Sequence, residues 1–164
     1  MVSGGVRVQV PDADAMRALG RALARLVQAG DLVVVSGALG AGKTTLAQGV
    51  GDGLGVRGPV TSPTFVIARV HPAVRPGPAL VHVDAYRVGD ALEVDDLDLD
   101  ASLPESVTLV EWGEGKVEAL SSDRLDVRIE CPDAADDPSP RLVWVQGTGP
   151  RWDGVDLSGL TRLA

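Results

Sequence analysis

Sulfur, aromatic rings and imidazoles are scarce in this sequence of 164 residues. The single cysteine, Cys131, cannot form a disulfide within the chain, which favours a reducing, cytoplasmic setting. The two histidines, His71 and His82, belong to no Cys/His cluster, so a zinc site is not expected. No apolar run approaches the ~20 residues of a membrane span, and no secretory signal is visible at the N-terminus. We therefore expect a soluble cytoplasmic protein with no membrane partner.

Positive charge is also limited. Lysine and arginine together number 15 against 23 aspartates and glutamates, which gives a formal net charge of −8. A protein surface with this negative charge repels the phosphate backbone of nucleic acids, so the chain is a poor candidate for binding nucleic acid by itself. A polyanionic ligand would have to be captured by local geometry.

Glycine, in contrast, is concentrated in one informative stretch. "GALGAGKT", residues 37–44, fits the phosphate-binding pattern G-x-x-x-x-G-K-[ST] between a predicted strand and a predicted helix. Glycines let backbone N–H groups turn around phosphate oxygens, and the helix that follows directs unpaired N–H groups at the same anion. Lys43 adds a positive charge and Thr44 a hydroxyl for Mg²⁺. The expected ATP-binding residues are Gly37, Leu39, Gly40, Ala41, Gly42, Lys43, Thr44 and Thr45.

The rest of the pattern predicts the fold. Hydrophobic periodicity predicts strands over residues 6–10, 32–36, 64–70, 80–86, 107–112, 124–130 and 141–146. It also predicts a helix from Asp12 to a stop at Gly30 and a second helix from Lys43 to Leu54 with Gly55 as its stop. Strands interleaved with helices favour an α/β class, here a three-layer P-loop NTPase fold. Its central sheet is expected to be mostly parallel with an antiparallel edge hairpin. We expect one P-loop ATPase domain over residues 1–148, and residues 149–164 form a tail with no assigned structure.

Two carboxylates end predicted strands. Asp84 closes "LVHVD" and Glu111 closes "VTLVE", so both should emerge at the carboxyl edge of the sheet, where open α/β folds bind ligands. Asp84, Glu111 and Lys43 are the catalytic candidates, and Thr44, Glu111 and Asp84 are the candidate metal ligands. The alternative is that each carboxylate only solvates a strand end. His82 is expected to be a satisfied strand residue rather than a base.

Three of the five aromatic residues stand beside these candidates, namely Phe65, Tyr86 and Trp112. They either shape a pocket or dock a partner, or they simply pack under the sheet.

The segment "TSPTF" follows the predicted helix after the glycine-rich loop. Its hydroxyls on Thr61, Ser62 and Thr64 would reach phosphate or metal-bound water in a nucleotide-dependent switch, and a simple Ser/Thr/Pro turn is the alternative.

Together, "GALGAGKTT", "TSPTF", "HVDAYR" and "EWGE" resemble the motifs of the bacterial TsaE ATPases, and the resemblance covers roughly residues 6–130. It implies an accessory ATPase that uses ATP and Mg²⁺ and works with TsaD and TsaB homologues. That complex places a threonylcarbamoyl group on tRNA, so this chain would meet tRNA only indirectly.

The resemblance also implies roles for individual residues. Residues 40–45 would wrap the phosphates, Thr44 would ligate Mg²⁺, and Glu111 and Asp84 would supply the acidic groups beside it. Thr61 and Thr64 would form the switch. Tyr86 and Arg87 of "HVDAYR" and Trp112 of "EWGE" would line a pocket or contact a partner.

Three other functions share the phosphate loop. A small-molecule kinase would need an acceptor pocket and an arginine-bearing lid. A GTPase is disfavoured because no Asn-Lys-x-Asp motif is present, Lys116 being in "GKVE". A nucleotide-gated binding module would order "TSPTF" on binding ATP, with only incidental hydrolysis.

Overall fold

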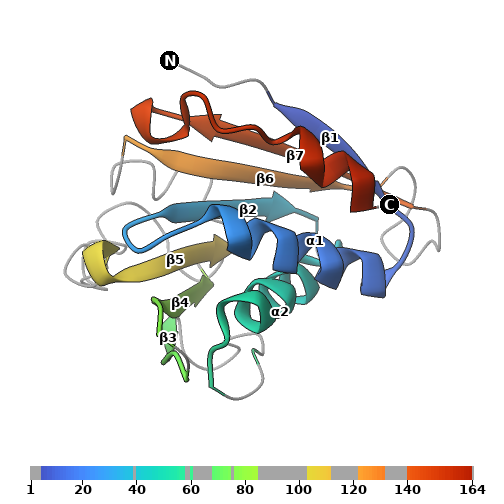
Figure 1. The fold of residues 1–164 in the computed structure, drawn as a ribbon. Coiled ribbons are helices and arrows are strands. Elements are labelled where there is room, and N and C mark those ends of the chain that lie inside the picture. The colour runs from blue at the N-terminus through green and yellow to red at the C-terminus, as the bar shows by residue number, and fades with distance from the viewer. Residues whose placement is uncertain are drawn as a thin grey trace.

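The computed structural model describes residues 5–38, 40–57, 60, 68–74, 76–84, 103–111, 122–131 and 140–163. In these ranges the chain forms one seven-stranded sheet with α1 and α2 on one of its faces (Figure 1). The strands are β1 Val6–Val10, β2 Leu32–Gly37, β3 Ala68–His71, β4 Ala79–Asp84, β5 Ser106–Glu111, β6 Arg124–Glu130 and β7 Arg141–Thr148. The helices are α1 Ala13–Leu26 and α2 Lys43–Leu54, with 3-10 turns η2 Leu103–Glu105, η4 Pro150–Trp152 and η5 Ser158–Leu163.

The sheet is mixed, with the order β1-β7-β6-β2-β5-β4-β3. The four central strands β6, β2, β5 and β4 run parallel, and β1, β7 and β3 pair antiparallel at the flanks. β6 and β7 form the expected antiparallel hairpin, but it is not at the edge as predicted, because β1 pairs with the outer side of β7. At the other edge β3 pairs antiparallel with β4.

Burial explains which strands are central. Every residue from Leu32 to Val35 in β2 is buried, as expected for a parallel strand that is covered on both faces. β7 instead alternates over its central residues, with Val143 and Val145 buried and Trp144 partly exposed, as in a strand with one covered face. Val33 and Val35 of β2 join Val143 and Val145 of β7 in one hydrophobic core with α1 and α2.

Both predicted helices form. Asp12 caps α1 by accepting a hydrogen bond from the backbone N–H of Ala15 at 2.8 Å. α1 ends at Leu26, earlier than the predicted stop at Gly30, because Val27 is already extended (φ −86°, ψ 155°). α2 ends as predicted at Gly55, which is left-handed with φ 71°.

The two helices touch backbone to backbone. A Cβ added to Gly20 of α1 would lie 2.4 Å from the carbonyl oxygen of Leu46, and one added to Gly49 of α2 would lie 2.2 Å from the carbonyl oxygen of Arg17. Only glycine allows so close an approach. The start of α2, where the predicted phosphate loop ends, is therefore held firmly against α1.

The C-terminal residues that the sequence pattern left unassigned contribute to the core. The side chain of Trp152 in η4 is fully buried, and Leu157 and Leu160 near η5 are buried beside it. Arg151 forms a two-pronged ion pair with Asp31, with nitrogen–oxygen distances of 3.1 and 2.9 Å. These contacts attach the tail to the segment that joins α1 to β2.

Three parts of the predicted architecture lie outside the described residues. The strand predicted over residues 64–70 is described only from Ala68, and the strand predicted over 80–86 only as far as Asp84. The third layer stays a prediction, because the two α-helices in the described ranges lie on the same face (Figure 1). None of the described helices has the length and apolar character needed to cross a membrane.

Candidate phosphate-binding and metal site

The parallel strands β2, β4 and β5 end at one edge of the sheet. The pairing register sets Asp84 at the end of β4 opposite Glu111 at the end of β5. On its other side Glu111 pairs with Val35 of β2, two residues before Gly37 begins the loop. The two carboxylates predicted from separate strand ends are therefore neighbours, beside the glycine-rich turn.

The turn itself uses backbone conformations that favour glycine. Gly40 has φ 79° and Gly42 has φ 113°, both in the left-handed region. Gly42 is also the N-cap of α2 and has no side chain to occupy the unpaired N–H groups of the first helical turn. Those N–H groups, and the positive end of the helix dipole, are available to an anion.

Lys43 is held inside this turn. Its side chain is buried, and Nζ donates hydrogen bonds to the carbonyl oxygens of Gly37 at 2.9 Å and Ala38 at 2.8 Å. The ammonium group thus sits at the mouth of the loop, where incoming phosphate oxygens would meet it.

Burial lowers the pKa of Lys43 below its ordinary value of 10.5, while the nearby carboxylates of Glu111 and Asp84 oppose that shift. Lysine attracts anions only while it is protonated. Because the pKa of Lys43 is lowered, raising the pH should weaken anion binding at a lower pH than it would for a lysine with an ordinary pKa. The chain has two lysines, so ¹³Cε-lysine labelling gives two signals, and Lys116→Arg identifies the signal of Lys43. We expect the ligand-free protein to titrate Lys43 with a midpoint below 10.5. A midpoint at or above that value would contradict the burial of this ammonium group.

Thr44 faces Glu111 across the start of α2. The threonine Oγ1 lies 3.3 Å from both carboxylate oxygens of Glu111, and Glu111 is buried. A hydroxyl and a carboxylate are hard oxygen ligands of the kind that Mg²⁺ takes when substrate phosphates and waters complete its shell. Among the described residues no group of three or more His, Cys, Asp or Glu side chains could hold a metal ion. Thr44 and Glu111 are therefore of the chemical kind that could hold Mg²⁺ beside a phosphate ligand.

His82 lies in a strand as the sequence interpretation expected, but its contact with Glu111 was not foreseen. It is fully buried in β4, and its Nε2 contacts Oε2 of Glu111. A signal was available in the sequence, because His82 stands two residues before Asp84 and residues two apart in a strand share one face.

A cavity of about 420 Å³ opens beside the phosphate loop. Its walls come from three parts of the chain that sequence reasoning did not connect. They are the turn from β1 into α1 with Val10 and Pro11, the loop and helix residues Gly40 and Thr45, and Arg141 of β7. It combines apolar walls with a few polar groups next to an anion site, as ligand pockets commonly do.

Several predicted site residues lie outside the described ranges. These are Leu39 of the loop, the switch residues Thr61, Ser62 and Thr64, the neighbouring Phe65, and the pocket or partner residues Tyr86, Arg87 and Trp112.

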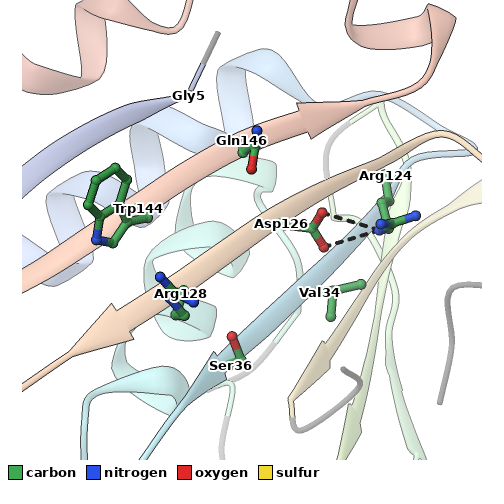
Figure 2. Close-up of a pocket in the computed structure, with 8 residues that line it drawn as sticks. All are labelled: Gly5, Val34, Ser36, Arg124, Asp126, Arg128, Trp144 and Gln146. Atoms are coloured by element: carbon green, nitrogen blue, oxygen red, sulfur yellow. Dashed lines mark hydrogen bonds and ion pairs between the residues drawn. The ribbon is translucent and has the colours of Figure 1, made fainter. Parts of the chain in front are cut away.

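A second cavity, of about 430 Å³, lies on the other face of the sheet (Figure 2). The strand register aligns Ser36 of β2, Arg128 of β6 and Trp144 of β7 in one row across it. These side chains alternate with core residues such as Val35 and Val127, so they point away from α1 and α2. This cavity is therefore separate from the phosphate loop and its carboxylates.

Comparison with known proteins identifies the family of this chain. Residues 10–137 match the family model described as "Threonylcarbamoyl adenosine biosynthesis protein TsaE". A "tRNA threonylcarbamoyladenosine biosynthesis protein TsaE" of Streptomyces coelicolor is 63% identical over 148 residues, covering 88% of this chain and 99% of that protein. The protein of the same name from Mycobacterium bovis is 50% identical over 136 residues, and this alignment covers 79% of this chain and 81% of that protein.

The fold has a counterpart among solved structures. The crystal structure of Bacillus subtilis YdiB superposes with a TM-score of 0.74 at 27% identity, covering 99% of this chain and 97% of YdiB. The family match spans the glycine-rich loop, both strand-end carboxylates and β6. This chain belongs to the TsaE family of tRNA threonylcarbamoyladenosine biosynthesis.

Proposed function

We propose that this chain is a Mg²⁺-dependent ATPase of the P-loop NTPase fold that acts in the cytoplasm as an accessory subunit of a complex of TsaD and TsaB homologues. One observation carries the proposal: Lys43, Thr44 and the strand-end carboxylate Glu111 converge at the N-terminus of α2. A buried ammonium group, a hydroxyl and a carboxylate at a helix N-terminus are the groups that bind and activate a metal-bound triphosphate.

The triphosphate is bound by the loop between β2 and α2. Backbone N–H groups of residues 40–45 face the phosphates, and Lys43 exchanges its bonds to the Gly37 and Ala38 carbonyls for phosphate oxygens. The nucleoside lies in the cavity beside the loop, where Pro11 offers an apolar wall and Arg141 a cationic plane for the base.

Thr44 and Glu111 would hold Mg²⁺, with Asp84 at the adjoining strand end as the second acidic group. When bound, the metal ion neutralises charge that develops on the phosphate oxygens. Glu111 and Asp84 divide two tasks, one supporting the metal and the other orienting the attacking water. Thr61, Ser62 and Thr64 act as the nucleotide-dependent switch, and Tyr86, Arg87 and Trp112 as pocket or partner residues.

The acidic chain fits an accessory role. Its net charge of −8 disfavours direct binding to tRNA, so the tRNA would be held by the partner proteins. The names of the relatives place them in tRNA threonylcarbamoyladenosine biosynthesis, and we extend that role to this chain.

A reconstituted modification assay tests the proposal. With purified TsaD and TsaB homologues, tRNA, ATP and the threonylcarbamoyl donor, we expect sustained modification only when this chain is present. Glu111→Ala should reduce ATP hydrolysis by about 100-fold or more, and should change ATP affinity measured without metal only a few-fold, because the proposed tasks of Glu111 concern the metal or the attacking water and not the binding of the phosphates. Modification should fall with hydrolysis.

The same assay distinguishes the alternatives. Phosphate transferred to an added metabolite would identify a kinase. If Glu111→Ala removes hydrolysis but leaves modification intact, the chain is a nucleotide-gated binding module. If modification proceeds equally without the chain, the accessory role is wrong.

A further inference from the structure

His82 is buried without the surroundings that a core residue would need. Its side chain has no exposed surface, and its Nδ1 has no hydrogen-bond partner among the described residues. An unpartnered buried ring nitrogen costs free energy. An apolar residue would fill this position in β4 without that cost. The imidazole must therefore contribute a favourable interaction through its other nitrogen, Nε2.

That nitrogen contacts the candidate metal ligand. Nε2 of His82 lies against Oε2 of Glu111. A carboxylate oxygen accepts hydrogen bonds, so Nε2 of His82 carries a hydrogen and donates it. The strand register aligns His82 with Leu109 of β5, two residues before Glu111, so the imidazole reaches diagonally to the carboxylate on the same face.

The carboxylate of Glu111 is therefore held on two sides. The imidazole of His82 contacts one oxygen from β4, and the hydroxyl of Thr44 lies 3.3 Å from both oxygens on the side of α2. A glutamate side chain has three rotatable bonds and can adopt many rotamers. A contact with the buried, fixed imidazole of His82 restricts the Glu111 side chain to few of them. With His82 in place, Glu111 faces the start of α2 before any ligand arrives.

We propose that His82 is a positioning residue, which orients the Glu111 carboxylate towards Thr44 so that the two together accept a divalent metal ion. The inference rests on the proposed metal site at Thr44 and Glu111 and adds a residue that acts through Glu111. Partners of this kind around metal ligands typically change metal affinity by about 10- to 100-fold when removed.

Two substitutions separate positioning from simple packing. His82→Leu fills much of the volume but has no donor. His82→Gln keeps an N–H donor near the place of Nε2. Mn²⁺ serves as the probe, because its binding to the full-length protein saturated with a non-hydrolysable ATP analogue is measured directly by electron paramagnetic resonance.

We expect His82→Leu to weaken Mn²⁺ binding by about 10- to 100-fold and His82→Gln to weaken it no more than a few-fold. Both should bind the analogue normally in the presence of EDTA, because among the described residues the imidazole makes no hydrogen bond to the phosphate loop. Unchanged Mn²⁺ affinity in His82→Leu, or equal losses in both variants, would overturn the inference. Failure of the unmodified protein to bind the analogue would instead refute the proposed nucleotide site.

His71 provides the matched control. It is the other histidine, it is also buried, and its Nε2 has no partner among the described residues. No hydrogen bond from His71 to Glu111 occurs in the described structure, so His71→Leu should leave Mn²⁺ affinity unchanged.

A measurement on the unmodified protein covers the case in which His82→Leu does not fold. Long-range ¹H–¹⁵N spectra of ¹⁵N-histidine protein contain two imidazoles, and His71→Leu assigns them. We expect Nε2 of His82 to carry a hydrogen and its signal to shift in Glu111→Gln. An Nδ1–H tautomer at His82 cannot donate to Glu111 and would overturn the inference.

Discussion

Lys43→Ala should lose ATP affinity by about 100-fold or more. The ammonium group is the one buried cation observed inside the phosphate loop in the described residues, and hydrogen bonds to charged groups contribute about 1.5–3 kcal/mol each. Without it, the phosphates would lose their charge partner and the carbonyls of Gly37 and Ala38 would face the anion. Isothermal titration calorimetry with ATP and Mg²⁺ measures this loss directly.

Lys116→Ala is the matched control, because it removes the only other lysine of the chain and so changes the net charge equally. It should bind ATP like the unmodified protein. Thermal unfolding of Lys43→Ala without nucleotide checks that the variant is folded. Normal ATP affinity in a folded Lys43→Ala variant would refute the assignment of residues 37–44 as the phosphate loop.

Trp152→Ala should destabilise the protein by about 3–5 kcal/mol, the usual cost of truncating a large buried aromatic side chain. Trp152 is fully buried and joins the core shared by α1 and the sheet. Domains of this size are commonly stable by only about 5–15 kcal/mol, so a large share of the stability would be lost. Urea unfolding followed by circular dichroism gives the change in free energy.

Trp144→Ala is the corresponding control, because Trp144 on β7 keeps 37% of its surface exposed. We expect this substitution to cost clearly less than Trp152→Ala. If the two variants unfold at the same urea concentration, the C-terminal turns do not belong to the cooperative unit, and the domain would end near residue 148 as the sequence pattern suggested.

Local patterns in the sequence predicted much of this fold. The cap at Asp12, the apolar run of β2 and the stop at Gly55 each depend on a few neighbouring residues, and each is confirmed. The phosphate loop was predictable for the same reason, since its glycines and Lys43 form a short contiguous motif. Asp84 and Glu111 could be proposed because strand ends can be recognised from local hydrophobicity.

Features that depend on contacts distant in sequence were not predictable in this way. The ion pair of Asp31 with Arg151 joins residues 120 positions apart. Trp152 lies in a three-residue turn that has no hydrophobic period to recognise. The contact of His82 with Glu111 requires the β4–β5 register, and the placement of β1 outside β7 requires the pairing of the two ends of the chain.

The glycine contact between α1 and α2 has a consequence for nucleotide binding. α1 starts at the wall of the cavity beside the loop, and α2 starts at the loop itself, so each helix carries one side of the proposed ligand site. The close backbone contacts at Gly20 and Gly49 fix the distance between the two helices. A methyl group at either position would push α1 and α2 apart. In the proposed site this would move the cavity wall that would hold the base away from the loop that would hold the phosphates.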